Sequence, residues 1–286
     1  MCIKCKLIGL TSLVVSLISC GSRGQEAENE GNDVAAFENV PADTIIQEEE
    51  ELVIREEIAP SLDGVFNDFL FAYLHNHTLR CERTAKPMRM EHSNRSTELL
   101  EQFDPAFEFS FLSGDYFTTL YDNASQMQSE DNGELEEDSV CTVQRINLND
   151  KTIRNFEFKR EKGKWQLVTI REATFKDDAR CDFLNFYANF CSDSLFQAQS
   201  IADPLHIIIL DSESDEGSID GIIDADQWQT FCSEVPFGII SNIRREGKNH
   251  GQHKVVMRKS GLSNGLQEIF TFTKEKGNWK LTKYEN

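Results

Sequence analysis

The chain has few basic residues for its length. Its 286 residues include 29 lysines and arginines against 49 aspartates and glutamates, which gives a formal net charge of -20. Binding to nucleic acid or to an anionic bilayer through a surface patch needs clustered positive charge. Lysine and arginine cluster only in two predicted hairpins of this sequence. The composition therefore argues against nucleic acid as a partner.

The sequence also lacks the common signatures of catalytic and metal sites. It has no glycine-rich phosphate loop, no zinc-ligand spacing and no nucleophile elbow. The acidic run 211–217 places oxygen ligands at alternate positions, but its glycine comes one position late and Ile222 replaces the glutamate of an EF-hand. A solvated acidic loop is the simpler interpretation, with Asp211, Glu213 and Asp215 kept as candidate metal ligands. No cofactor is predicted.

Only the N-terminus contains a long apolar run. Lys4 and Lys6 precede the apolar residues 7–18, which are too few to span a bilayer as a helix and are typical of a signal-peptide core. The run ends in Leu17-Ile18-Ser19-Cys20, which resembles a bacterial lipobox. An ordinary secretory signal is the alternative. The resemblance implies a signal peptide over 1–19 and a lipid on Cys20.

The residues that follow predict an acidic tether and the membrane to which the protein is attached. Residues 21–60 contain twelve acids against Arg23 and Arg55, so residues 20–59 are expected to form a disordered spacer. Gly21 follows the cysteine, whereas an inner-membrane retention signal of the enterobacterial kind has aspartate there. We therefore expect attachment to the outer membrane, on its periplasmic face or at the cell surface.

The remainder of the chain contains a duplication. Residues 156–167 match residues 270–281 at seven of twelve positions. A helical stripe of aromatic and apolar residues also recurs 117 positions later, where Phe66, Phe69, Leu70, Tyr73 and Leu74 correspond to Phe183, Phe186, Tyr187, Phe190 and Cys191. Their spacing of three, four, seven and eight places them on one face of a helix. Two copies of one small domain are predicted.

Each copy is expected to open with this amphipathic helix and to close in antiparallel strands. The predicted strands are 140–148, 152–160 and 164–171 in the first copy, and 252–258, 266–274 and 278–284 in the second. Lys162-Gly163 and Lys276-Gly277 are the predicted turns. Pro87 and Pro204 are expected to mark changes of chain direction, and short helices are expected at 97–103 and 226–232.

This order of elements resembles the nuclear-transport-factor-2-like (NTF2-like) fold. The fold class is therefore α+β, with two tandem domains over 60–173 and 174–286, each a long N-terminal helix packed on a curved antiparallel sheet. With the lipobox and the acidic spacer, the chain is similar to an uncharacterised family of bacterial lipoproteins with tandem NTF2-like domains. A cystatin-like or ferredoxin-like pair is the alternative.

In enzymes of this fold, the helix and the concave sheet enclose a cone that contains an acid or a histidine. His77, one turn beyond Tyr73 on the predicted stripe, is the candidate general base, and a partly exposed histidine at a helix end is the alternative. Trp165 and Trp279 share one register of the repeated hairpin and are expected in the core. Trp228 occurs in one copy only and, with Tyr73 and His77, is a candidate ligand contact.

Five cysteines lie beyond the signal peptide and Cys20, so at least one thiol is free. A disulfide between Cys81 and Cys141 is one candidate pairing. Cys181 and Cys191 are too far apart to pair if they share one helix.

The leading functional prediction is a lipid-anchored envelope protein that binds a small ligand, a glycan fragment or an envelope partner without catalysis. The enzyme alternative is an isomerase or hydrolase-like reaction inside one cone with His77 as base. The third alternative is a structural module whose cones are filled by their own phenylalanines.

Overall fold

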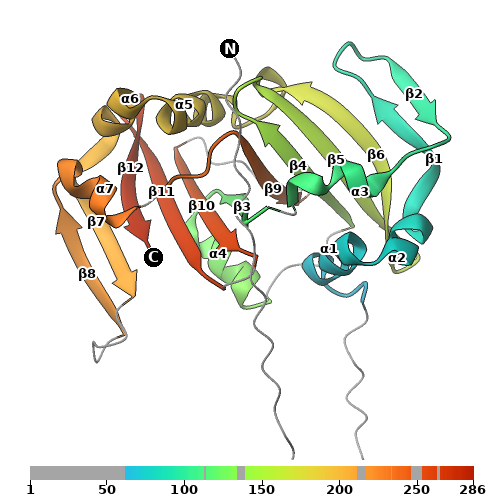
Figure 1. Cartoon of the computed structure of the whole chain (residues 1–286), viewed down its shortest axis with the longest axis horizontal. Coiled ribbons are helices and arrows are strands. Elements are labelled where there is room, and N and C mark those ends of the chain that lie inside the picture. Colours follow the sequence, from blue (N-terminus) through green and yellow to red (C-terminus); the bar gives the residue numbers. More distant parts are fainter. Residues whose placement is uncertain are drawn as a thin grey trace, which may run out of the picture. The chain divides into compact units, whose positions relative to one another are not determined.

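The computed structural model describes residues 62–112, 114–133, 139–210, 217–232, 234–245, 253–262 and 265–286. These residues form two six-stranded sheets with helices packed on them (Figure 1). The first sheet has the order β2 (Thr97–Leu100), β1 (Thr84–Glu91), β6 (Lys164–Thr174), β5 (Thr152–Glu161), β4 (Val140–Asn147) and β9 (Ile239–Arg245). The second has the order β3 (Tyr116–Tyr121), β10 (Lys254–Gly261), β11 (Gln267–Glu275), β12 (Asn278–Glu285), β7 (Ile201–Leu210) and β8 (Ser218–Ile223).

The two copies exchange one strand. β9 from the second copy completes the first sheet beside β4, and β3 from the first copy completes the second sheet beside β10. The exchanged strands meet at Thr118 and Ser241, where each hydroxyl donates to the other residue's carbonyl oxygen, at 2.6 and 2.9 Å, and accepts from its backbone N–H, at 3.0 and 2.8 Å. Two short polar side chains thereby satisfy backbone groups that face each other between the sheets.

Each sheet also contains one parallel pair, so the prediction of purely antiparallel sheets was wrong. β1 runs parallel to β6, and β7 runs parallel to β12. Both pairings shift register beside Pro87 and Pro204, which lie inside β1 and β7 and do not reverse the chain. Proline lacks an N–H donor and is tolerated in a strand where the ladder is already irregular.

The strands of the repeated hairpins are confirmed within a few residues. Lys162-Gly163 and Lys276-Gly277 connect them, with φ of 51° and 78° in the first turn and 49° and 89° in the second. Positive φ at both positions defines the hairpin turn whose twist matches the strands. The predicted helix at 97–103 was wrong, since Thr97–Leu100 pair with β1. The predicted helix at 226–232 is confirmed, because the chain there forms a 3₁₀ turn, Ala225–Gln227, followed by α7, Trp228–Phe231.

The first helix of each copy is interrupted at the same place. α1 (Phe66–His75) is followed by α2 (His77–Glu82), and α5 (Cys181–Ser192) by α6 (Ser194–Gln199). Asn76 and Asp193 are extended between them, and their side chains accept hydrogen bonds from backbone N–H groups of the second helix. Asparagine and aspartate are strong N-cap residues, so each starts a new helix in a new direction.

Aromatic rings fill the space between helix and sheet. Phe158 on β5 lies 5.4 Å from Phe66 and 5.4 Å from Tyr73 between ring centroids. Its equivalent, Phe272 on β11, makes the same contacts with Phe183 and Phe190, the equivalents of Phe66 and Tyr73, at 5.4 and 5.3 Å. In the first copy, α3 (Pro105–Glu108) leads into further rings that pack on β5, and Trp165 and Trp279 are buried as expected.

No helix among the described residues is long and apolar enough to cross a membrane. α4 (Ala124–Asp131) follows β3 in the chain, and its N-cap Asn123 accepts from the backbone N–H of Gln126. None of the five described cysteines forms a disulfide, so the exposed Cys81 is not joined to Cys141, which is buried in β4.

Candidate functional site

A cleft of about 180 Å³ lies between α1 and the exchanged strands, and we refer to it as the interface cleft. Its apolar residues come from α1, β4, β9 and the segments around β3 and β10, and they are Leu70, Phe71, Leu74, Leu112, Phe117, Val143, Ile243 and Leu262. Both copies therefore contribute to one cleft. It exists because β9 and β3 cross from one copy to the other.

One wall of the cleft is polar. Asn67 on α1 donates from Nδ2 to Glu130 Oε1 at 2.7 Å, and its Oδ1 accepts from Arg245 Nη2 at 3.4 Å. Arg258 on β10 bonds to the carboxylate of Asp131 and lies 3.7 Å from Glu130. The side chains of Arg258 and Glu130 are 9% and 11% exposed. This wall thus consists of charges that already neutralise one another.

Arg258 also contacts Tyr121, the last residue of β3. Its guanidinium carbon lies 5.1 Å from the centre of the Tyr121 ring, and its Nη2 donates to the phenol oxygen. Burial, together with the nearby Glu130, raises the pKa of Tyr121 well above its ordinary value. The phenol therefore stays protonated. The wall as a whole has no net charge, because the carboxylates of Glu130 and Asp131 balance the guanidinium groups of Arg258 and Arg245.

The equivalent position in the first copy carries no charge. Gln144 on β4 lies 114 residues before Arg258, and it is fully enclosed between Asn155 and Asn242. Its Nε2 donates to Asn155 Oδ1 at 2.8 Å, and its Oε1 accepts from Asn242 Nδ2 at 2.7 Å. Asn242 Oδ1 in turn accepts from the backbone N–H of Leu120 at 2.9 Å. Gln144 in the first copy is thus enclosed by the side-chain amides of its neighbours, whereas the equivalent Arg258 in the second copy lines the interface cleft.

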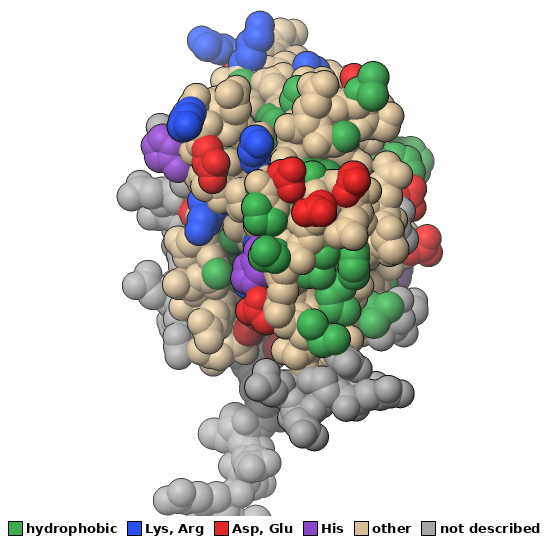
Figure 2. Space-filling view, turned by 90° about the vertical axis from the view of Figure 1, so that its left-hand side faces the viewer, with side chains coloured by type: hydrophobic (Ala, Val, Ile, Leu, Met, Phe, Trp, Pro, Cys, Tyr) green, Lys and Arg blue, Asp and Glu red, His purple; other side chains and the backbone are tan. Residues whose placement is uncertain are grey.

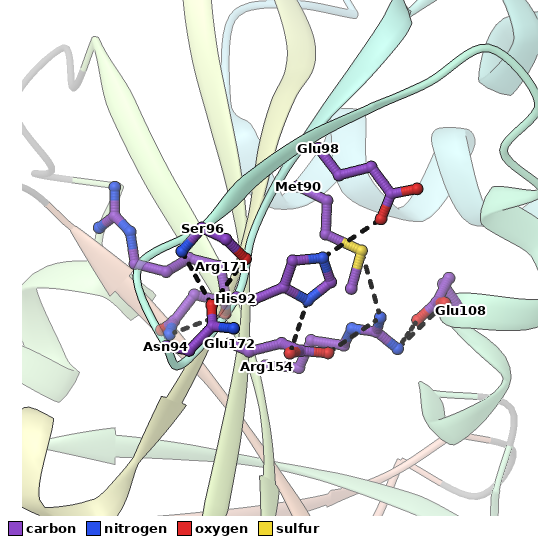
Figure 3. A network of polar contacts seen from close by, with 10 residues as sticks. Met90, His92, Asn94, Ser96, Glu98, Glu108, Arg154, Arg171 and Glu172 are labelled. Carbon is purple, nitrogen blue, oxygen red and sulfur yellow. Dashed lines mark hydrogen bonds and ion pairs between the residues drawn. The ribbon is translucent and has the colours of Figure 1, made fainter.

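A second polar network lies on the first sheet, at the end of β1 (Figure 3). The two ring nitrogens of His92 lie 3.1 Å from Glu172 and 3.3 Å from Glu98. The hydrogen bonds to Glu172 and then to Glu98 raise the pKa of His92, because two carboxylates favour the charged ring. His92 therefore ties the β1–β2 hairpin to β6 over a wider pH range than a free histidine would.

The same network includes Arg154, which stands two residues before Phe156 on the helix side of β5. Arg154 Nη1 donates to both Glu108 oxygens, at 3.1 and 2.8 Å, and its Nη2 lies 3.6 Å from Glu172 (Figure 3). The equivalent residue in the second copy is Glu268, which accepts from Tyr284 at 2.7 Å and pairs with Lys259. The two copies carry opposite charges at one register, and each charge is paired within its own copy.

The structure separates the predicted candidates from one another. His77 is exposed on α2, where its ring nitrogen lies 3.8 Å from the Cys81 sulfur. It does not continue the helical stripe that contains Tyr73, because the two residues belong to different helices. Asn76 breaks the helix between them. Tyr73 is buried, and its hydroxyl lies 2.7 Å from Thr84 Oγ1.

Trp228 is only 3% exposed, and its ring centroid lies 5.1 Å from that of Tyr284, so it is buried in the second copy like Trp279. Its role as a ligand contact stays a prediction. Cys20, Asp211, Glu213 and Asp215 lie outside the described residues, and their roles stay predictions. Within the described ranges, no group of three histidine, cysteine or acidic side chains could hold a metal ion.

The cleft residues Asn67, Glu130 and Arg258 were missed by sequence reasoning. They come from three segments separated by 63 and 128 positions, and no spacing rule connects them. One signal was available, because Arg258 follows the apolar run Val255-Val256-Met257 in a predicted strand and is buried. A buried charge in a strand needs a partner, but the sequence does not say which.

A comparison with solved structures identifies the class of fold. The chain is similar to an NTF2-like protein from Bacteroides fragilis NCTC 9343, whose crystal structure matches with a TM-score of 0.68 at 24% identity. The match covers 79% of this chain and 96% of the other, a share that requires both copies. The fold is thus NTF2-like, as the sequence resemblance implied.

Residues 46–286 match the family described as a domain of unknown function, DUF4348, and the chain belongs to that family. No curated protein matches the sequence.

Proposed function

We propose that this protein is a lipid-anchored protein of the outer membrane that binds an uncharged, mainly apolar group in the interface cleft without catalysis. The observation that carries this proposal is the composition of the cleft. Eight of its fifteen lining residues are apolar, five are uncharged polar residues, and its two charged residues, Glu130 and Arg258, lie 3.7 Å from each other. Ligand sites in proteins are typically concave and apolar, with a few polar groups that orient the ligand.

Two features narrow the class of ligand. A glycan fragment needs many hydrogen-bonding partners, whereas the Asn67, Glu130 and Arg258 side chains are already bonded to one another or to neighbours. A free anion would meet the carboxylates of Glu130 and Asp131, which already pair with Arg258. An aliphatic or aromatic group, such as an acyl chain or a peptide side chain, fits the apolar walls best.

The cones are less suited to a ligand. Phe109, Phe111 and Phe156 stack with centroid distances of 4.4 to 6.2 Å in the first cone, and Phe272 contacts four rings in the second. This favours binding at the junction between the copies over binding inside either cone.

The cleft is tested with two fluorescent probes that share one skeleton. We expect neutral N-phenyl-1-naphthylamine to bind the full chain more tightly than its sulfonated analogue, 1-anilinonaphthalene-8-sulfonate. Leu74→Trp should weaken binding of the neutral probe by at least about tenfold, because indole fills the cleft. Leu195→Trp adds the same group at a site that is 75% exposed on α6 and should change nothing. Equal loss in both variants would refute the cleft as the site.

The anchor is tested by fractionation of cells that make the full chain. Wild-type protein should sediment with the outer membrane, and Cys20→Ser should move to the soluble fraction or keep its signal peptide, since the acyl chains supply the attachment. A Cys81→Ser chain is the control, because Cys81 is an exposed thiol in the folded part. Unchanged sedimentation of the Cys20→Ser chain would contradict the anchor.

A further inference from the structure

The negative charge of the folded part is concentrated in one stretch of the chain. Residues 181–243 contain eleven aspartates and glutamates and no lysine or arginine, so they hold -11 of the total charge of -20. Seven of these acids lie among the described residues, and they are Asp182, Asp193, Asp203, Asp220, Asp224, Asp226 and Glu234. This stretch supplies α5, α6, β7, β8 and α7. Any partner that approaches β7 and β8 therefore meets a surface that favours positive charge.

β8 is the last strand of the second sheet and pairs only with β7 among the described strands. Three large apolar side chains of this hairpin are exposed, Leu210 by 73%, Ile222 by 69% and Ile219 by 52%. Figure 2 faces this side of the molecule and shows hydrophobic side chains gathered on it, with acidic side chains beside them. An open strand edge with exposed apolar residues is a template for another strand.

The equivalent edge in the first copy is protected. β2 pairs over only four residues, and the outer side of β1 carries Arg89 and Glu91, which pair at 2.9 Å, with Arg171 at 2.6 Å from Glu91. At an offset of 117, Arg89 corresponds to His206 and Glu91 to Ile208. The second copy thus has no arginine or glutamate at these two positions, and His206 Nε2 lies 2.6 Å from Asp220 Oδ1.

Gly221 in the middle of β8 has no structural reason to be glycine. Its φ is not in the left-handed region, and a Cβ built on it would meet nothing within 4 Å. Glycine weakens a strand interior and often marks a place where another backbone approaches closely. Gly221 is opposite Ile207 in the β7–β8 pair and lies between Ile219 and Ile223 on one face of β8, so that face has no side chain at its centre.

We propose that β8 is the docking edge for an extended segment of a partner protein that alternates apolar and basic residues. The segment adds a seventh strand to the second sheet, so that backbone hydrogen bonds supply affinity. Its apolar side chains lie on the face of Ile219 and Gly221. Its lysines or arginines lie on the opposite face, beside Asp220 and Ile222, where acidic side chains would be repelled.

The experiment uses the full chain and two short blocked peptides, one alternating valine with lysine and the other alternating valine with glutamate. Fluorescence anisotropy should show binding of the lysine peptide that weakens with added salt, and binding of the glutamate peptide at least about tenfold weaker. Gly221→Val should keep or raise the melting temperature, because valine favours strands and meets no clash, while it weakens lysine-peptide binding by at least about tenfold.

Ile222→Lys, at an exposed position, is the second variant and should weaken binding similarly without loss of fold. Leu99→Lys places the same change on the β2 edge, where Leu99 is 61% exposed, and should leave binding unchanged. The proposal is overturned if the lysine peptide does not bind, if both peptides bind equally, or if Gly221→Val binds as wild type. It is also overturned if light scattering shows a dimer that Gly221→Val dissociates, because a second copy would then occupy the edge.

Discussion

A chain cut at the boundary predicted from sequence, between residues 173 and 174, is expected to give two fragments that do not fold alone. The first fragment lacks β9, and the second lacks β3. In the first sheet, Ile240, Val143 and Ile146 are each 1% exposed, and they lose their contacts at this edge. Burial of each such side chain contributes about 1.5–3 kcal/mol, so the loss is comparable with the whole stability of a domain, about 5–15 kcal/mol.

The two fragments should nevertheless complement each other when expressed together. Circular dichroism and size-exclusion chromatography are expected to show a one-to-one complex with cooperative unfolding, and unstructured or aggregated material for either fragment alone. The exchanged strands would restore both sheets, because β3 and β9 already cross between the copies. Independent cooperative unfolding of a monomeric fragment would contradict this prediction.

The extent of sequence prediction follows from how local each feature is. The hairpins at Lys162-Gly163 and Lys276-Gly277 were predicted because turn residues and strand alternation are adjacent in the chain. The exchange could not be predicted, since Thr118 and Ser241 occupy equivalent positions and would fit either sheet. Only the geometry of the connections decides which edge each strand joins.

The failure at His77 has a similarly local origin. The stripe from Phe66 to Leu74 extends in phase to position 77, but Asn76 caps a new helix there through its bond from the Leu79 N–H. The N-cap signal was present in the sequence and competed with the stripe. The interface cleft had no such signal, because Asn67, Glu130 and Arg258 meet only after both sheets have formed.

The side-chain amides of Asn155, Gln144 and Asn242 form a hydrogen-bonded chain between the copies, which we call the amide ladder. We expect this ladder to be as important for stability as the aromatic core. We expect Asn242→Leu to lower the free energy of unfolding by about 2–5 kcal/mol, because it leaves the Leu120 N–H and the Gln144 carbonyl without their partner at a site of 0% exposure. Chemical denaturation measures the change, and the matched control is Asn189→Leu on the exposed side of α5, which should stay within about 0.5 kcal/mol.

A double-mutant cycle with Gln144→Leu then separates the ladder from simple loss of packing. If the amides act as a unit, the double variant should be less destabilised than the sum of the single variants by at least about 0.5 kcal/mol, because the second substitution removes a group that the first has already left unpaired. Strict additivity, or a loss in Asn242→Leu no larger than in Asn189→Leu, would mean that the exchanged strand is held by its apolar residues alone. The expected coupling would instead mean that Asn242 fixes the position of β9 against both neighbouring strands, through Gln144 on β4 and the backbone of Leu120 on β3.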